Sequence, residues 1–280
     1  MAARPLHRSR MPASRGVRRR RGVSLLGALV FALAIAALVI LVIRLSSHRA
    51  TRIRSTTTTS PGRVVPSTDL DPRGVPMMSH KPVPVVPGFG GCPPEGDGGD
   101  PALNRLKNRI DSAAWIPVSL ERLIALPWPS NVVRHRQRSE WRWLDATAVA
   151  RYEGMPFVVE GYVAGASQSG PESTNCHGAD ASFRDWHIWL ATSPGRDRRR
   201  ALVAEATPVV RAAHPRWSLS AIRRLGRDST LVRVSGWLML DPEHPEQLRK
   251  TRGTIWELHP ILRIEARARD AWVDLQELRR

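Results

Sequence analysis

The chain has 280 residues, a formal net charge of +18 and two cysteines. Residues 1–54 hold 12 arginines and no acidic residue, and removing them from the 43 basic residues leaves 31 basic against 25 acidic side chains. The rest of the chain therefore has a net charge of only +6, which is compatible with a polyanionic partner but does not by itself indicate one.

An apolar segment follows the basic tail of residues 1–22. Residues 23–45 include 21 consecutive uncharged residues, from Val23 to Ile43, which is long enough to cross a bilayer as a helix. No small-residue cleavage site follows, which favours a signal anchor over a cleaved signal peptide. The arginine-rich flank predicts a single-pass protein of the cell membrane, with a cytoplasmic N-terminus and an extracytoplasmic globular domain.

The next two segments differ in composition. Residues 46–99 are rich in Pro, Thr, Ser and Gly and show no apolar periodicity, so they predict a disordered linker. Residues 100–156 predict an N-terminal helical cap with helices over about 101–112, after Ser119, and within 140–152. We expect these helices to pack on the domain that follows.

Residues 157–268 predict a β-barrel. Strand patterns cover 157–166, 186–192 and 201–207, a helical pattern covers 215–225, and two further strands lie within 231–265. This order is that of an OB-fold, a five-stranded Greek-key barrel with a helix between strands three and four. The predicted class is mainly β with α: an OB-like barrel with N-terminal helices, preceded by one transmembrane helix and a disordered linker. Residues 269–280 are expected to form a C-terminal tail.

Four short motifs carry a resemblance to known proteins. They are NCH at 175–177, DWHIWL at 185–190, SGWL at 235–238 and WELHP at 256–260. On these motifs the chain resembles bacterial envelope proteins that have an OB-fold-like domain and no assigned activity, over about residues 100–267. The resemblance implies the fold and carries no mechanism.

Two long polar loops mark the predicted ligand site. OB-folds bind ligands on strands two and three, between loops that correspond here to residues 167–184 and 241–253. Trp189 and Trp237 have the parity opposite to the apolar residues of their strands, so they are candidates for stacking on bases or sugars, with packing beneath the N-terminal helices as the alternative. The candidate ligand-binding residues are His177, Trp189, Trp237, His244, Arg249 and Arg252.

Histidines and one carboxylate suggest a metal site in the same region. The candidate ligands are His177, His187, Glu257 and His259, because imidazole and carboxylate groups suit zinc and an open coordination position would activate water. Paired-ligand spacing of the His-Glu-x-x-His type does not occur. Hydrogen bonding within the barrel is therefore the alternative role for His187 and His259.

Cys92 and Cys176 are the whole supply of cysteine. In an extracytoplasmic domain we expect them to form a disulfide that ties the end of the linker to the first long loop. The alternative is a nucleophilic Cys176 that uses a histidine other than its neighbour His177 as base, since adjacent residues of an extended segment point apart.

Three functions stay open at this stage. The first is a non-catalytic, membrane-anchored OB-fold binding module whose ligand is an oligonucleotide, a glycan or an envelope protein. The second is a metal-dependent hydrolase that uses the His/Glu cluster with zinc as cofactor. The third is a structural envelope component that binds a membrane-protein partner. No complete catalytic motif decides among them.

Overall fold

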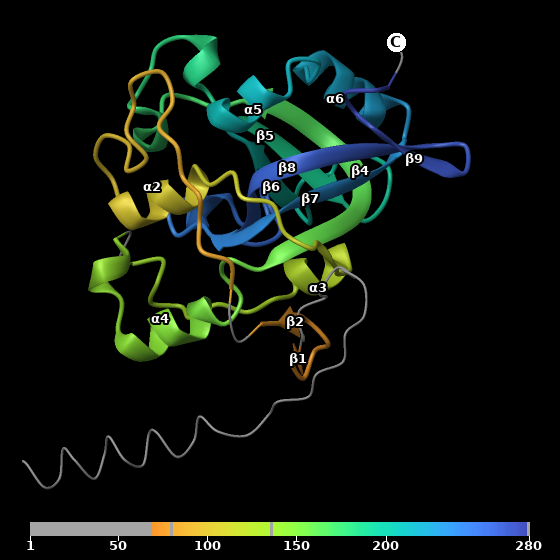
Figure 1. Cartoon of the computed structure of the whole chain (residues 1–280). Helices are drawn as coiled ribbons and strands as arrows, with labels where there is room; N and C mark the ends of the chain where they lie inside the picture. The colour runs from red at the N-terminus through yellow and green to blue at the C-terminus, as the bar shows by residue number, and fades with distance from the viewer. Residues whose placement is uncertain (1–68, 79–80, 135–136, 279–280) are drawn as a thin grey trace, which may run out of the picture. The chain divides into compact units, whose positions relative to one another are not determined.

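The structure, a computed structural model, describes residues 69–78, 81–134 and 137–278 (Figure 1). The basic tail, the predicted signal anchor 23–45 and the first part of the predicted linker lie outside these residues. Within the described part of the chain, no helix combines the length and the apolar character needed to cross a membrane.

A closed five-stranded barrel forms the core of the described residues (Figure 1). The strands are hydrogen-bonded in the order β4-β5-β6-β8-β7, and β7 pairs with β4 to close the barrel. All these pairs are antiparallel except β6 with β8. This confirms the predicted mainly β fold with a five-stranded barrel. The bounds are β4 (Pro156–Gln168), β5 (Trp186–Ala191), β6 (Leu202–Ala206), β7 (Leu231–Leu240) and β8 (Trp256–Ala268).

Alternation along β5 and β6 separates the barrel interior from its outer face. Ile188 and Leu190 of β5 and Leu202 and Ala204 of β6 belong to the main hydrophobic core. Because side chains alternate along a strand, the residues between them point outward. The outward-facing residues of these two strands are His187, Trp189, Val203 and Glu205.

The apolar pattern of β8 departs from the predicted alternation. Alternation in the sequence places Leu262 on the same face as Trp256, Leu258 and Ile264. In the structure Leu262 is only partly buried, whereas Ile261 is fully buried. The pairing of β7 with β8 shifts on both sides of Gly236, and each shift inserts one extra residue on β8. The two insertions together restore the original parity at Ile264.

Helices connect and flank the barrel. α5 (Pro208–Ala213) and α6 (Leu219–Arg227) lie between β6 and β7, where one longer helix at 215–225 was predicted. The N-terminal helices are α2 (Pro101–Lys107), α3 (Leu120–Ile124) and α4 (Trp143–Ala150). Asp100 caps α2 by accepting hydrogen bonds from the backbone N–H groups of Ala102 and Leu103. α2 ends earlier than predicted, and the chain after it buries Arg109 against the barrel.

Two segments predicted to lack structure are ordered. In the predicted linker, β1 (Asp69–Leu70) pairs with β2 (Pro76–Met77), and Val75 between them is fully buried. In the predicted C-terminal tail, β9 (Ala271–Asp274) pairs with the end of β8. A further short strand, β3 (Ile116–Pro117), runs parallel to β4. β3 and β9 cover edges that β4 and β8 would otherwise leave unpaired, whereas β1 and β2 form a separate two-stranded sheet.

Candidate metal centre

The outer face of β5, β6 and β8 is covered by other parts of the chain. We call this layer the cover; it includes Cys92, α2 with Asn108, and the loop residues 173–176. α2 contacts both β8 and the 3-10 turn Ser173–Asn175. Thr174 in this turn donates a hydrogen bond from Oγ1 to Oδ1 of Asn104, and its carbonyl oxygen accepts one from Asn108. A disulfide joins Cys92 to Cys176 within the cover. The polar side chains beneath it are consequently shielded from water.

Three polar residues lie side by side on three adjacent strands beneath this cover. His187 of β5 is the direct cross-strand neighbour of Glu205 of β6. The parallel register places Ala204 beside Leu258, so that Glu205 and His259 are adjacent as well. Oε2 of Glu205 lies 3.1 Å from Nε2 of His187 and 3.3 Å from Nδ1 of His259. One carboxylate therefore stands between two imidazoles.

Asp185 completes an inner group of three ligands. Its Oδ1 accepts a hydrogen bond of 2.9 Å from Asn175, and its Oδ2 lies 3.7 Å from Nε2 of His259. Candidate ligand atoms of Asp185, Glu205 and His259 lie within 4.8 Å of one another. Among the described residues, Oδ2 of Asp185, Oε2 of Glu205 and Nε2 of His259 are buried without a hydrogen-bond partner. Such atoms are rare in native proteins, and a bound cation would satisfy all three.

Glu257 contacts Nδ1 of the His259 ring, the nitrogen that Glu205 also approaches and that is remote from Asp185. Its Oε1 lies 3.1 Å from Nδ1 of His259, and its Oε2 accepts a hydrogen bond of 3.2 Å from Arg252. Arg252 donates a second hydrogen bond of 2.8 Å to Asp241. Metal-binding histidines usually donate their other ring N–H to a carboxylate, which fixes the ring. With its proton on Nδ1, His259 directs the lone pair of Nε2 toward Asp185.

A second group of three possible ligands shares Glu205. It consists of Glu172, His187 and Glu205, whose ligand atoms also lie within 4.8 Å of one another. Nε2 of His187 lies 3.6 Å from Oε1 of Glu172, and the two side chains are 23% and 24% exposed. This outer group is partly exposed to solvent, and Glu205 links it to the inner group.

Burial and negative charge shift the pKa values of the cluster in opposite directions. Burial, reinforced by the charges of Glu172 and Glu205, raises the pKa of Asp185 well above its ordinary value. Burial lowers the pKa of His259 to about 4, so the ring is neutral. For His187, burial lowers the pKa, but Glu205 and Glu172 outweigh it and the net shift is well upward. The carboxylates thus repel one another around a neutral ring, and a proton or a metal ion can reduce that repulsion.

Lys107 is a buried cation of the cover. Burial disfavours its charged form, but Asp241, Glu172, Glu257 and Glu205 together outweigh this effect and raise its pKa. No local pattern indicates this role, because Lys107 stands near the end of a helical pattern, where a basic residue is usual.

The predicted metal ligands meet only in part. His187, Glu257 and His259 lie in the cluster, with Glu257 bonded to the histidine ring. His177 lies outside it: its side chain is exposed, and its Nε2 is 3.0 Å from the carbonyl oxygen of Asp97. Asp185 and Glu205 were not predicted as ligands. For Glu205, the available signal was a single carboxylate in the otherwise apolar strand 201–207.

The predicted stacking residues are covered. Trp237 is 1% exposed, and Arg109 lies over its ring at 3.4 Å from the centroid. Nε1 of Trp237 donates a hydrogen bond to the carbonyl oxygen of Asp111. Trp189 is 7% exposed beneath Arg198. Both rings are almost fully buried, and an arginine side chain lies over each of them, so neither is available for stacking on a ligand.

The predicted ligand-binding residues of the loop 241–253 have separate environments. Arg252 is buried in ion pairs with Asp241 and Glu257, so it does not extend toward a ligand. His244 lies 2.8 Å from Asp241, a contact that raises the pKa of this histidine although burial opposes it. Arg249 is exposed at the loop tip. These three side chains therefore do not form one binding surface.

Cys176 is bonded to Cys92 and is not a free thiol in this structure. The alternative prediction, a nucleophilic Cys176, is therefore wrong for this structure. Comparisons of the chain with protein-family models, with curated proteins and with solved structures found no match.

Proposed function

We propose that the barrel binds a divalent transition-metal ion between Asp185, Glu205 and His259. Two observations carry the proposal. Candidate ligand atoms of the three residues lie within 4.8 Å of one another, and each residue has a buried side-chain atom without a hydrogen-bond partner among the described residues. Two carboxylate oxygens and one imidazole nitrogen form a donor set that suits zinc, manganese or iron(II). Glu257 would fix the histidine ring from its other nitrogen, as outer partners of metal sites do.

Burial favours a structural role for this ion. The side chains of Asp185 and His259 are 0% exposed, and that of Glu205 is 5% exposed. A catalytic zinc keeps a coordination position open to water and substrate, whereas a structural zinc is enclosed by its ligands. The ion would join Asp185, in the covering loop, to strands β6 and β8. For this reason the proposal does not extend to hydrolysis.

The setting of the domain is part of the same proposal. The strand order, with α5 and α6 between the third and fourth barrel strands, supports an OB-like architecture. The disulfide supports an oxidising compartment, which agrees with an extracytoplasmic domain held at the membrane by segment 23–45. OB-folds bind ligands on the face of strands two and three, and the cover occupies that face here. An oligonucleotide, glycan or envelope-protein partner would therefore bind at another surface.

Calorimetric titration of the metal-free, full-length protein with zinc or manganese tests the proposal. We expect one equivalent to bind the wild type. Glu205→Gln keeps the size of the side chain and removes its charge, so it is expected to weaken binding by about 10- to 100-fold or more. Glu246→Gln, at an exposed position, is the matched control and should bind as the wild type does.

Two outcomes would contradict the metal proposal. One is a wild-type protein that binds neither ion. The other is equal affinity in wild type, Glu205→Gln and Glu246→Gln, which would place the ion elsewhere. Near-ultraviolet circular dichroism of each variant shows whether its tertiary structure is intact, so a loss of affinity is separated from a loss of folding.

A further inference from the structure

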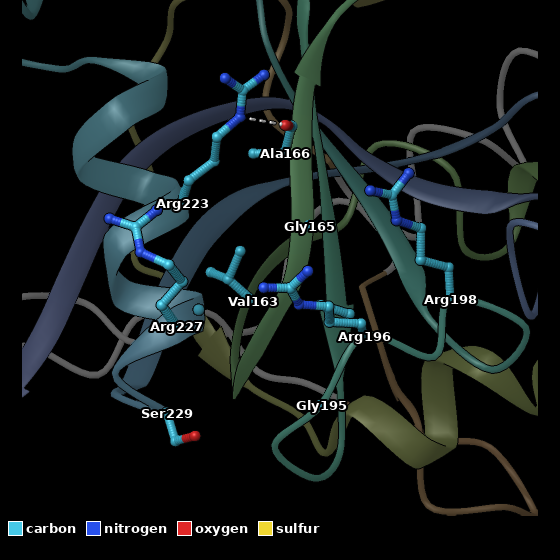
Figure 2. A pocket seen from close by; sticks show the side chains of 11 residues that line it. Val163, Gly165, Ala166, Gly195, Arg196, Arg198, Arg223, Arg227 and Ser229 are labelled. Carbon is cyan, nitrogen blue, oxygen red and sulfur yellow. Dashed lines mark hydrogen bonds between the residues drawn. The ribbon is translucent and has the colours of Figure 1, made fainter.

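A second polar site lies between β4, α6 and the loop that connects β5 with β6. It is a cavity of about 560 Å³ whose described lining contains four arginines and no acidic residue. Figure 2 shows Arg223 and Arg227 on the helix and Arg196 and Arg198 on the loop, and all four line the cavity. Two separate elements, α6 and the loop between β5 and β6, thus bring guanidinium groups to one cavity beside β4.

Arg198 is held in place by packing. Its Cζ lies 4.0 Å from the centroid of the Trp189 ring, a cation–π contact. On β4, Gly165 leaves the room that this guanidinium occupies, because a Cβ at that position would lie 2.4 Å from Nη2 of Arg198. Stacking on Trp189 and the space left at Gly165 therefore both fix the position of Arg198 at the edge of the cavity.

Arg223 is positioned by the backbone of β4. Its Nε donates a hydrogen bond of 2.8 Å to the carbonyl oxygen of Ala166, which leaves its terminal nitrogens for another acceptor (Figure 2). α6 can approach β4 this closely because of Gly226, where a Cβ would lie 2.5 Å from the carbonyl oxygen of Val163. Arg227 follows on the same helix, and its side chain is exposed.

The charge around the cavity is unbalanced. Asp197, beside two of the arginines in sequence, pairs with Arg199 at 3.0 Å. Asp228 is exposed and is not part of the lining. Four guanidinium groups that share one cavity repel each other. A bound anion would attract all four and so offset this repulsion. Arginine is the side chain best shaped for this, since its planar fork donates two parallel hydrogen bonds to phosphate oxygens.

We propose that this cavity binds a multiply charged phosphate compound. Its volume falls in the range of small-molecule sites, and several fixed donors suit a ligand with more than one phosphoryl group. The proposal uses no residue of the candidate metal centre and does not depend on it. The phosphates can belong to a soluble small molecule or to the backbone of a nucleic acid, and the experiment distinguishes these two sources.

Calorimetric titration of the full-length protein with inorganic pyrophosphate is the test. We expect the wild type to bind, with an affinity that falls between about 50 and about 200 mM salt, because the contacts are ionic. The double variant Arg223→Gln/Arg227→Gln should bind about tenfold more weakly or worse. Arg151→Gln/Arg269→Gln removes the same charge at exposed positions outside the cavity and should bind like the wild type.

Competition then identifies the source of the phosphates. Displacement of pyrophosphate from the wild type by a short oligothymidylate would support the site with a nucleic-acid backbone as ligand, and no displacement would support it with a small molecule. The proposal is overturned if the wild type does not bind pyrophosphate. It is equally overturned if both double variants lose the same affinity, since binding would then depend on overall charge.

Discussion

Glu205 and His259 lie on neighbouring parallel strands, with Oε2 of the carboxylate 3.3 Å from Nδ1 of the ring and both side chains buried. Parallel pairing of β6 with β8 creates this contact, and Asp185 approaches the other nitrogen of the same ring. Because no water reaches these groups freely, their neighbours and any bound ion decide their charge. Substitutions that change a single atom of this cluster should therefore have large effects on metal binding and on the stability of the fold.

Asp185→Asn should remove the stabilisation that metal gives to the fold. A ligand that binds only the native state stabilises it by about 2.7 kcal/mol at a concentration 100 times its dissociation constant. We expect zinc to raise the unfolding temperature of the wild type and to leave that of Asp185→Asn almost unchanged. Asp180→Asn, at an exposed position of the same loop, is the control. Equal zinc shifts in all three proteins would show that Asp185 does not hold the ion.

Glu257→Gln should destabilise the protein even without metal. The change leaves Arg252 with one anionic partner in place of two and weakens the hold on His259. Removing one partner of a buried ion pair costs about 3–5 kcal/mol. Urea denaturation measures this loss against Glu277→Gln, an exposed control. A stability within about 0.5 kcal/mol of the wild type would contradict the ion-pair network.

Removal of the disulfide should loosen the cover more than the barrel. The bond links residues separated by 84 positions, so Cys92→Ser/Cys176→Ser is expected to cost about 2–4 kcal/mol. Hydrogen exchange should become faster around Thr174 and Asn108, whose contact holds the cover. The amides of β7 in the barrel should be accelerated less than those of the cover. Uniform acceleration in barrel and cover would contradict a separate covering unit.

Gly226→Ala should lower stability because α6 has no space for a methyl group on this side. The added Cβ would lie 2.5 Å from a backbone oxygen of Val163, so the helix must move away from β4. Overpacking of this kind costs about 1–3 kcal/mol. Ser220→Ala, exposed on the same helix, is the control and should be neutral in urea denaturation. A Gly226→Ala protein as stable as this control would contradict the close packing.

Asp71 should contribute stability at neutral pH and lose it in acid. Burial raises its pKa, but hydrogen bonds from Val75, Tyr152 and Arg73 outweigh burial and bring the pKa below the ordinary value of 3.8. The carboxylate therefore stabilises the native state above that value, and the contribution disappears as the pH falls through the lowered pKa. Asp71→Asn should be less stable than wild type near about pH 7, and the difference should shrink in acid. If the two proteins differed in stability by the same amount at neutral and at acid pH, the lowered pKa of Asp71 would be excluded as the cause.

Local sequence patterns predicted the barrel well. Alternation assigned Ile188 and Leu190 to the interior, and the capping residues Asp100 and Ser119 marked the starts of α2 and α3. The same alternation placed Trp189 and Trp237 outward, which is correct for each strand. Alternation does not show what packs over an outward residue, and that is why stacking on a ligand and packing beneath the N-terminal helices were both left open for these rings.

The candidate metal centre was predicted only in part for a related reason. His187 and His259 stand out by residue type, but Glu205 and Asp185 become partners only when β6 pairs with β8 and the first long loop folds over them. These contacts join segments that are distant in the sequence. The arginines of the cavity lie on a helix and on a short loop outside the region where an OB-fold suggests a ligand, so no local pattern identified them.

The metal proposal is tested most directly by an anomalous difference map from crystals of the zinc-loaded protein, recorded at the zinc absorption edge. We predict one peak between Oδ2 of Asp185, Oε2 of Glu205 and Nε2 of His259, at about 2.0–2.2 Å from each atom. No peak at this position in crystals that contain zinc, or a peak bound only by exposed histidines such as His177, would contradict the proposal.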